Sequence, residues 1–162
     1  MANIGFHKAI KENGGRTEIT AVGDRYVLEN MLANGYNLGG EQSGHIIFTD
    51  FSTTGDGPVT ALQVLSYLKR TRHKASAITK IMTSYPQLLV NVKVATKDGW
   101  EDNEAIKASI EEGKQQLGEN GRILVRPSGT EPLIRVMAEG PDQKELEEIC
   151  YKIADVVKAQ QG

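Results

Sequence analysis

A seven-residue loop between two strand-forming runs constrains the fold of this chain more than any other stretch. The runs are residues 123–125 and 133–137, and the loop between them reads Arg-Pro-Ser-Gly-Thr-Glu-Pro at residues 126–132. The two prolines restrict the backbone of the loop, and we expect Gly129 to permit a turn that other residues could not make. The pattern therefore predicts two neighbouring strands joined by a tight loop.

The composition of this loop indicates an anion site. Ser128, Gly129 and Thr130 offer consecutive backbone N–H groups and two hydroxyls, and Arg126 and Arg135 can add a guanidinium on each side. Such convergent donors fit a phosphate dianion. A tight β-turn with two surface arginines is the alternative, and Ser-Gly-Thr alone would favour it. The full seven-residue string favours the phosphate.

A second polar loop lies in the first half of the chain, where residues 36–48 predict a strand, a glycine-rich loop and another strand. The glycines let the backbone turn sharply or approach a ligand closely. Donors and acceptors of mixed character crowd into the same loop, as in sites that read sugar hydroxyls. A polar hairpin tip is an equal alternative, because such tips often contain Gly and Ser. The polar residues are Glu41, Gln42, Ser43 and His45.

Apolar periodicity predicts an α-β-α order over the first residues and further helices behind it. A chain that starts directly on a helix lacks the strand that a crossover helix should follow, so we expect an upstream part to be missing. The predicted elements are a helix at 4–12, a strand at 17–22, a helix from 27 to about 34, a helix from Pro58 to about 72 whose Leu62, Leu65 and Leu68 face a core, and a short helix at 75–83.

Pro86 follows the short helix and predicts a domain boundary, with domains at residues 1–84 and 85–162. The second domain reads β-α-β-β-α, which predicts helices layered on an antiparallel sheet with the phosphate loop at a strand junction on its edge. Its elements are a strand at 88–95, a helix from Asp102 as the cap to about 117, the two strands of the loop, and a helix from 142 to 157 with Asp142 and Glu145 as a capping-box-like pair.

Bulk properties exclude several classes of function. A formal net charge of −2 over 162 residues argues against a general affinity for nucleic acid. No apolar run approaches membrane-spanning length and no signal peptide is visible, so we expect no membrane partner. The single cysteine, Cys150, lies on the apolar side of a helical pattern, which predicts a buried structural thiol in a protein of the reducing cytoplasm.

A metal site is not expected within the chain. The histidines at 7, 45 and 73 are scattered, and Asp56 has no further carboxylates at ligand spacing. Asp56 instead stands directly before the helix that begins near Pro58, where an aspartate commonly caps the terminus.

The two loops together resemble those of the α-D-phosphohexomutases. In that family the Gly-Glu-Gln-Ser-Gly-His loop at residues 40–45 is the sugar-recognition loop of the third domain, and the loop at 126–132 is the phosphate-binding loop of the fourth. The resemblance extends over the whole chain and includes residues 22–26, 53–57 and 86–92. It implies an incomplete α/β sugar-binding domain followed by a small C-terminal domain like the TATA-box-binding protein, that is, a C-terminal fragment of a four-domain enzyme.

The resemblance also implies an activity, the interconversion of glucosamine 6-phosphate and glucosamine 1-phosphate through a phosphoserine enzyme, on the route to cell-wall amino sugars. The active-site serine loop and the Asp-Gly-Asp-x-Asp-Arg loop that holds Mg²⁺ have no counterpart in the sequence. We therefore expect no catalytic residue and no metal ligand here, and no turnover by the chain alone. The implied phosphate-binding residues are Arg126, Ser128, Gly129, Thr130 and Arg135, and the implied sugar-binding residues are Glu41, Ser43, His45, Asp24 and Arg25.

The expected partner is an amino-sugar phosphate. The resemblance implies a homodimer for the complete enzyme, and a monomer is expected for a chain without the first domain. Two other interpretations stay open: a free-standing module that binds sugar phosphates or docks on a partner protein, and an unrelated α+β protein with two fortuitous loops.

Overall fold

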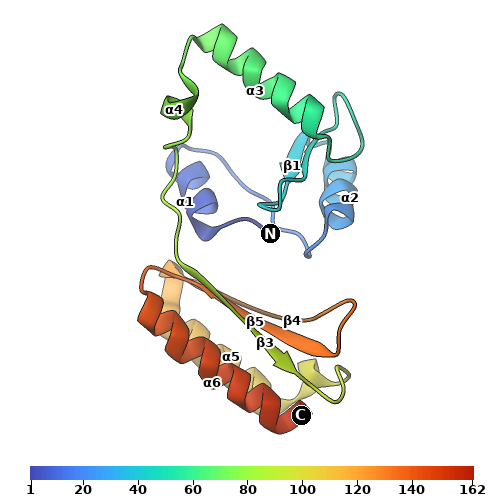
Figure 1. Cartoon of the computed structure of the whole chain (residues 1–162), viewed down its shortest axis with the longest axis vertical. Helices are drawn as coiled ribbons and strands as arrows, with labels where there is room; N and C mark the ends of the chain where they lie inside the picture. Colours follow the sequence, from blue (N-terminus) through green and yellow to red (C-terminus); the bar gives the residue numbers. More distant parts are fainter. The chain divides into compact units, whose positions relative to one another are not determined.

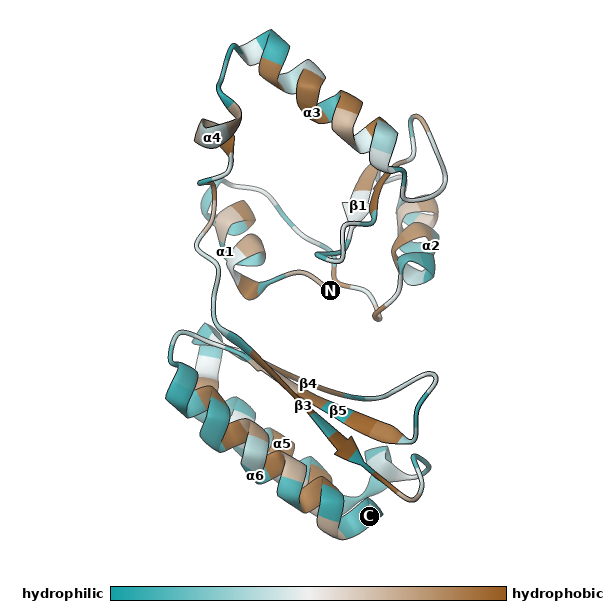
Figure 2. Cartoon of the chain, in the orientation of Figure 1, coloured by the Kyte–Doolittle hydropathy of each residue, from teal (hydrophilic) through white to brown (hydrophobic).

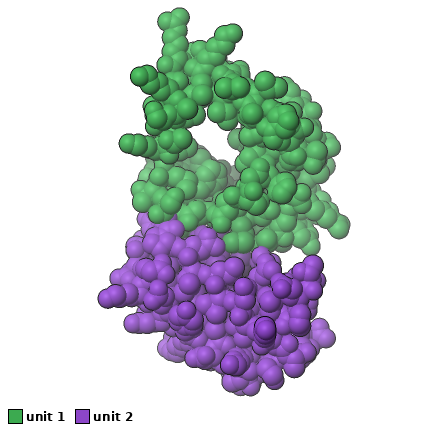
Figure 3. All heavy atoms as spheres, in the orientation of Figure 1, with its two compact units in different colours: residues 1–84 green, residues 85–162 purple.

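The computed structural model describes all residues from 1 to 162, which divide into two compact units (Figures 1 and 3). Residues 1–84 form unit 1 and residues 85–162 form unit 2. Unit 1 contains a two-stranded antiparallel sheet and unit 2 a three-stranded one. Each candidate loop therefore belongs to a different unit and a different sheet.

Unit 1 begins with helix α1 (Ile4–Glu12), as predicted, and the Asn3 side chain caps it by accepting from the N–H of Gly5. Helix α2 (Asp24–Asn34) ends at Gly35, whose φ of 70° is the left-handed geometry that glycine adopts without strain. Strands β1 (Leu38–Gly40) and β2 (Ile46–Phe48) pair on either side of the predicted sugar-recognition loop at residues 40–45. Helix α3 (Gly57–Thr71) starts at the predicted cap, where Asp56 accepts from the N–H of Val59 at 2.8 Å, and α4 (Ala75–Ile78) follows.

Two predicted elements of unit 1 are wrong or too long. Residues 17–22 form no strand, because an isolated strand is not stable and this segment pairs with no other; Ile19 is 70% exposed. The short helix predicted to reach residue 83 ends at Ile78. It has no side-chain cap, and β-branched residues follow at Thr79 and Ile81, so little favours a further turn.

Unit 1 has a thin core. Its buried hydrophobic side chains are Met31 and Ile47. The sequence predicts that α3 turns an apolar face to a core, yet α3 buries no residue, and Leu62 and Leu65 are 64% and 60% exposed. Figure 2 shows hydrophobic residues along α3, and Figure 3 shows an opening through unit 1. The two-stranded sheet is too small to cover this helix.

Unit 2 has the predicted β-α-β-β-α order. Its strands are β3 (Gln87–Lys93), β4 (Arg122–Pro127) and β5 (Leu133–Glu139), in the antiparallel order β3-β5-β4. The helices α5 (Glu104–Leu117) and α6 (Gln143–Gln161) pack on one face of this sheet (Figure 1). The core lies between these layers, and it contains Ile106, Ile134, Val136, Ala138, Leu146, Cys150 and Ile153.

The helix caps of unit 2 follow the sequence with one exception. Asp142 caps α6 by accepting from the N–H groups of Lys144 and Glu145. Helix α5 is capped by Asn103, not by Asp102, because Asp102 lies within a 3₁₀ turn at residues 100–102. The Asn103 side chain accepts from two N–H groups of the first helical turn. Cys150 is fully buried, as predicted.

Candidate anion and sugar sites

The register between β4 and β5 determines how the loop at 128–132 is held. Arg126 lies directly opposite Arg135, and Pro127 opposite Ile134. The loop closes with the Ser128 N–H donating to the Leu133 carbonyl at 2.9 Å. The N–H of Val94, the residue after β3, donates to the Pro132 carbonyl at 3.1 Å. The loop therefore joins an edge strand to the central strand and is fixed on two sides.

Arg126 and Arg135 lie on the same face of the sheet, because residues directly opposite in an antiparallel pair share a face. Ile134 and Val136 of β5 pack in the core under the helices, so the intervening Arg135 points to the other face. Like charges directly opposite one another destabilise a sheet. An anion bound between the two guanidinium groups would remove that penalty.

The two arginines retain unused hydrogen-bonding capacity. The side chain of Arg126 has no hydrogen-bond or ion-pair partner in the chain. Arg135 makes only long contacts through one terminal nitrogen, 3.4 Å to the Ser128 hydroxyl and 3.5 Å to the Glu131 carboxylate. Its Nε is buried without a partner. A buried donor of this kind calls for a ligand or a water molecule.

The loop offers two free backbone donors rather than three. Ser128 is 2% exposed, its N–H is used within the hairpin, and its hydroxyl accepts from the Glu131 N–H at 3.3 Å. Gly129 and Thr130 are exposed, and their N–H groups bond to nothing in the chain. These two N–H groups are therefore the donors that a ligand could reach.

Gly129 is not required by the turn, which corrects the prediction from the sequence. Its φ lies outside the left-handed region, and a Cβ added at this position would meet no atom within 4 Å. Alanine could adopt the same backbone here. What glycine provides is open space beside the backbone, which lets a ligand come close to it.

The structure adds Lys97, which the sequence did not single out. Its ammonium donates to the Ser128 carbonyl at 2.8 Å from a half-buried position. The pairing of β3 with β5, in which Lys93 lies opposite Leu133, brings the segment after β3 beside the loop. Only the choice of strand partner places this lysine, and no local pattern in the sequence reports it.

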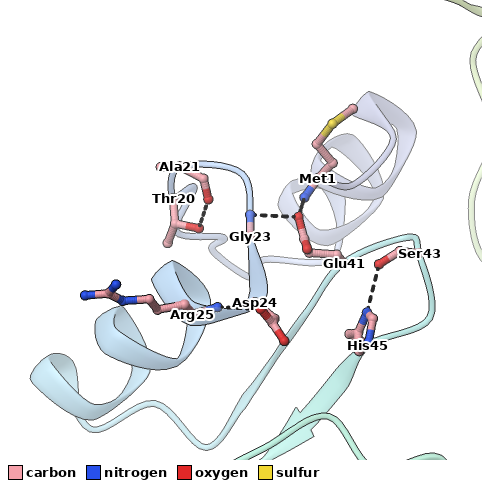
Figure 4. Close-up of polar contacts among 9 residues, drawn as sticks. All are labelled: Met1, Thr20, Ala21, Gly23, Asp24, Arg25, Glu41, Ser43 and His45. Atoms are coloured by element: carbon pink, nitrogen blue, oxygen red, sulfur yellow. Dashed lines mark hydrogen bonds and ion pairs between the residues drawn. The ribbon is translucent and has the colours of Figure 1, made fainter. Parts of the chain in front are cut away.

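The five predicted sugar-binding residues lie near one another in unit 1 (Figure 4). They are Asp24, Arg25, Glu41, Ser43 and His45. Within the loop at residues 40–45, the Ser43 hydroxyl and the His45 Nδ1 are 3.3 Å apart, and the loop is closed by the Glu41 N–H donating to the His45 carbonyl at 2.9 Å. The Glu41 carboxylate accepts from the Gly23 N–H at 3.4 Å and pairs with the ammonium of Met1. The contact with Gly23 brings the turn at Asp24 beside this loop.

The side chain of Arg25 is oriented differently from those of the other four predicted sugar-binding residues. Its guanidinium pairs with Glu29 at 2.7 Å along α2 and points away from Ser43 and His45 (Figure 4). The hydrogen bond to Glu29 raises the pKa of Arg25 further above its ordinary value. Asp24 accepts from the Arg25 N–H at the start of the helix, a position that favours a negative charge.

Comparison with known proteins identifies the family. Residues 1–85 match the alpha/beta/alpha domain III of phosphoglucomutase/phosphomannomutase, and residues 89–156 match the C-terminal domain. The chain belongs to the phosphoglucomutase/phosphomannomutase family. It is 56% identical over 160 residues to the phosphoglucosamine mutase of Brevibacillus brevis, and this match covers 99% of the chain but 36% of the length of that relative.

Solved structures agree on the fold. The N-acetylphosphoglucosamine mutase of Aspergillus fumigatus superposes with a TM-score of 0.82 at 20% identity, over 99% of this chain and 37% of that one. A structure of that fungal enzyme in complex with GlcNAc-6P and magnesium has a TM-score of 0.57 at 25% identity, over 68% of this chain and 22% of that one. The present chain has no group of three or more His, Cys, Asp or Glu side chains that could hold a metal ion, and no helix long and apolar enough to cross a membrane.

Proposed function

We propose that this chain is the domain III and C-terminal portion of a phosphoglucosamine mutase, which interconverts glucosamine 6-phosphate and glucosamine 1-phosphate through a phosphoserine. The proposal rests on the similarity to phosphoglucosamine mutases over 99% of the chain. The phosphate-binding role is supported by one observation: Arg126 and Arg135 lie opposite one another beside two loop N–H groups that have no partner in the chain. In this proposal the chain recognises the substrate and does not carry out the phosphoryl transfer.

The phosphate group binds at the hairpin loop of unit 2. Arg126 and Arg135 supply charge-assisted hydrogen bonds, and the N–H groups of Gly129 and Thr130 supply neutral ones. The Ser128 hydroxyl, which accepts from the loop and from Arg135, keeps its own proton to donate. Two or three charge-assisted bonds of about 1.5–3 kcal/mol each, set against the cost of immobilising the ligand, give a dissociation constant in about the millimolar range.

The sugar hydroxyls are read by the loop of unit 1. Glu41 accepts from a hydroxyl, Ser43 donates or accepts, and His45 lies beside them. The turn at Asp24 and Arg25 lies near the same loop, with the Arg25 guanidinium directed toward Glu29. The 3.3 Å contact between Ser43 and His45 orients both side chains before a ligand arrives.

The complete enzyme supplies the remaining parts in this proposal. Mg²⁺ offsets charge at the transferred phosphoryl group and is held by residues outside this chain, as is the phosphoserine. The complete enzyme is a cytoplasmic homodimer, whereas the chain alone is a monomer. The C-terminal unit has the fold of the TATA-box-binding protein, and its β-α-β-β-α order supports this.

An NMR titration with three ligands tests the proposal. Inorganic phosphate should shift the amides of Gly129 and Thr130 and leave residues 41–45 unchanged. Glucosamine should do the reverse, and glucosamine 6-phosphate should shift both sets. Equal shifts over the whole surface, or none at residues 129 and 130, would refute the phosphate assignment. Mutase turnover by the chain alone, with Mg²⁺ and a sugar bisphosphate, would refute the claim that the chain recognises the substrate without carrying out phosphoryl transfer.

A further inference from the structure

We propose that Lys97 is a positioning residue of the phosphate loop, which fixes the Ser128–Gly129 peptide so that the Gly129 N–H faces the anion. The inference rests on the proposed function of the loop. It is carried by one contact, the 2.8 Å hydrogen bond from the Lys97 ammonium to the Ser128 carbonyl.

The planarity of the peptide bond makes this contact directional. In a trans peptide the carbonyl and the following N–H point in opposite directions from one rigid plane, and the chain has no cis bond. A lysine that holds the Ser128 carbonyl on one side therefore holds the Gly129 N–H toward the other side. Without this contact the peptide could rotate, because Gly129 has an open environment and few steric limits.

The charge of Lys97 also strengthens the donor. A cation on the carbonyl oxygen polarises the amide, and hydrogen bonds in such a chain reinforce one another. Lys97 forms no ion pair with any carboxylate of the chain, so its charge is not neutralised there. Three cationic side chains, Lys97, Arg126 and Arg135, thus surround a loop whose only carboxylate is Glu131.

The other contacts of the loop do not replace this role. The Ser128 N–H and the Pro132 carbonyl anchor the two ends of the loop to the strands. Neither constrains the peptide between Ser128 and Gly129. Lys97 is the one side chain that bonds to this peptide, which separates its effect from the general stability of the hairpin.

Three variants of the whole chain test the inference. Lys97→Met removes the donor and keeps the length of the side chain, Lys97→Arg restores a donor, and Lys144→Met removes an exposed lysine at the start of α6 as the matched control. The readouts are the ¹H–¹⁵N shift of the Gly129 amide without ligand, the dissociation constant for inorganic phosphate, and the midpoint of urea unfolding.

Lys97→Met should move the ligand-free Gly129 amide resonance and weaken phosphate binding about fivefold to tenfold, as expected for the loss of one ordinary hydrogen bond. Lys97→Arg should bind phosphate within about twofold of the unchanged chain, and Lys144→Met should alter none of the three readouts. An unmoved Gly129 resonance in Lys97→Met, or weaker binding that Lys97→Arg fails to restore, would overturn the inference. Absence of phosphate binding by the unchanged chain would instead refute the proposed function. The ligand-free Gly129 resonance would still test whether Lys97 fixes the Ser128–Gly129 peptide.

Discussion

Substitution of Arg126 by methionine should abolish most phosphate binding and leave the fold intact. Arg126 is half-buried and lies opposite Arg135 in the sheet, and its side chain has no hydrogen-bond or ion-pair partner within the chain. Methionine keeps the apolar stem that packs along the strand and removes only the guanidinium. Relief of the repulsion between the two arginines should offset the small loss of packing, so the free energy of unfolding should change by no more than about 0.5 kcal/mol.

The loss of affinity follows from the contacts that the guanidinium would make. A hydrogen bond to a charged group contributes about 1.5–3 kcal/mol, which corresponds to a dissociation constant about 10-fold to 150-fold larger. A site that binds phosphate in about the millimolar range would then have no measurable affinity. The Gly129 and Thr130 amides should cease to shift, although Arg135 and both N–H groups are still present.

The assay is a titration of the chain with inorganic phosphate at constant ionic strength, followed through the amides of Gly129 and Thr130. Arg70→Met is a matched control, since Arg70 is exposed on α3 of unit 1 and has no partner. A dissociation constant of Arg126→Met within about twofold of the control would contradict the assignment. Weaker binding accompanied by unfolding of unit 2 would equally reject the claim that Arg126 serves the ligand and not the fold.

Four further predictions concern unit 2. Gly129→Ala should leave stability unchanged or slightly higher, because its φ is not left-handed, yet weaken phosphate binding several-fold by crowding the loop; urea unfolding and the same titration measure both. Glu131→Gln should tighten phosphate binding by up to about fivefold, because it removes a negative charge that repels the phosphate and pairs with Arg135 at 3.5 Å. This gain in affinity should disappear at high salt. Arg122→Met should destabilise unit 2 by about 3 kcal/mol, because it breaks the 2.9 Å ion pair with the fully buried Glu139; replacing Glu139 by leucine as well should recover much of the loss in urea unfolding. Burial raises the pKa of Cys150 to about 11, so the unfolded chain ionises first and stability should fall as the pH rises from about 8.5 toward 11; Cys150→Ala should show a smaller fall.

Local physics made much of unit 2 predictable from the sequence. The helix from Asp142 has an aspartate cap and a single apolar face, and both are properties of neighbouring residues. The strands beside the phosphate loop and the burial of Cys150 follow from the same kind of pattern. The misplaced cap at Asp102 is a shift of one residue, caused by a 3₁₀ turn that a periodic pattern does not report.

Unit 1 was less predictable, because its elements depend on partners distant in the sequence. Residues 17–22 have the alternation of a strand but no neighbouring strand to bond to. The apolar face of α3 has the expected spacing, yet Leu62 and Leu65 remain exposed and Leu68 is only half-buried, because the two-stranded sheet does not cover them. A sequence pattern shows which secondary structure a segment favours. Whether another segment pairs with it or buries it depends on residues elsewhere in the chain.

The candidate anion site divides in the same way. The sequence by itself determined which side chains stand at the loop: two arginines, two hydroxyls and a glycine between prolines. The tertiary structure alone decided that Arg126 and Arg135 lie opposite one another, that the Ser128 N–H is consumed by the hairpin, and that Lys97 reaches the Ser128 carbonyl. The physical reason is that chemical character belongs to each residue, whereas register and strand order arise only when segments far apart in the chain pair.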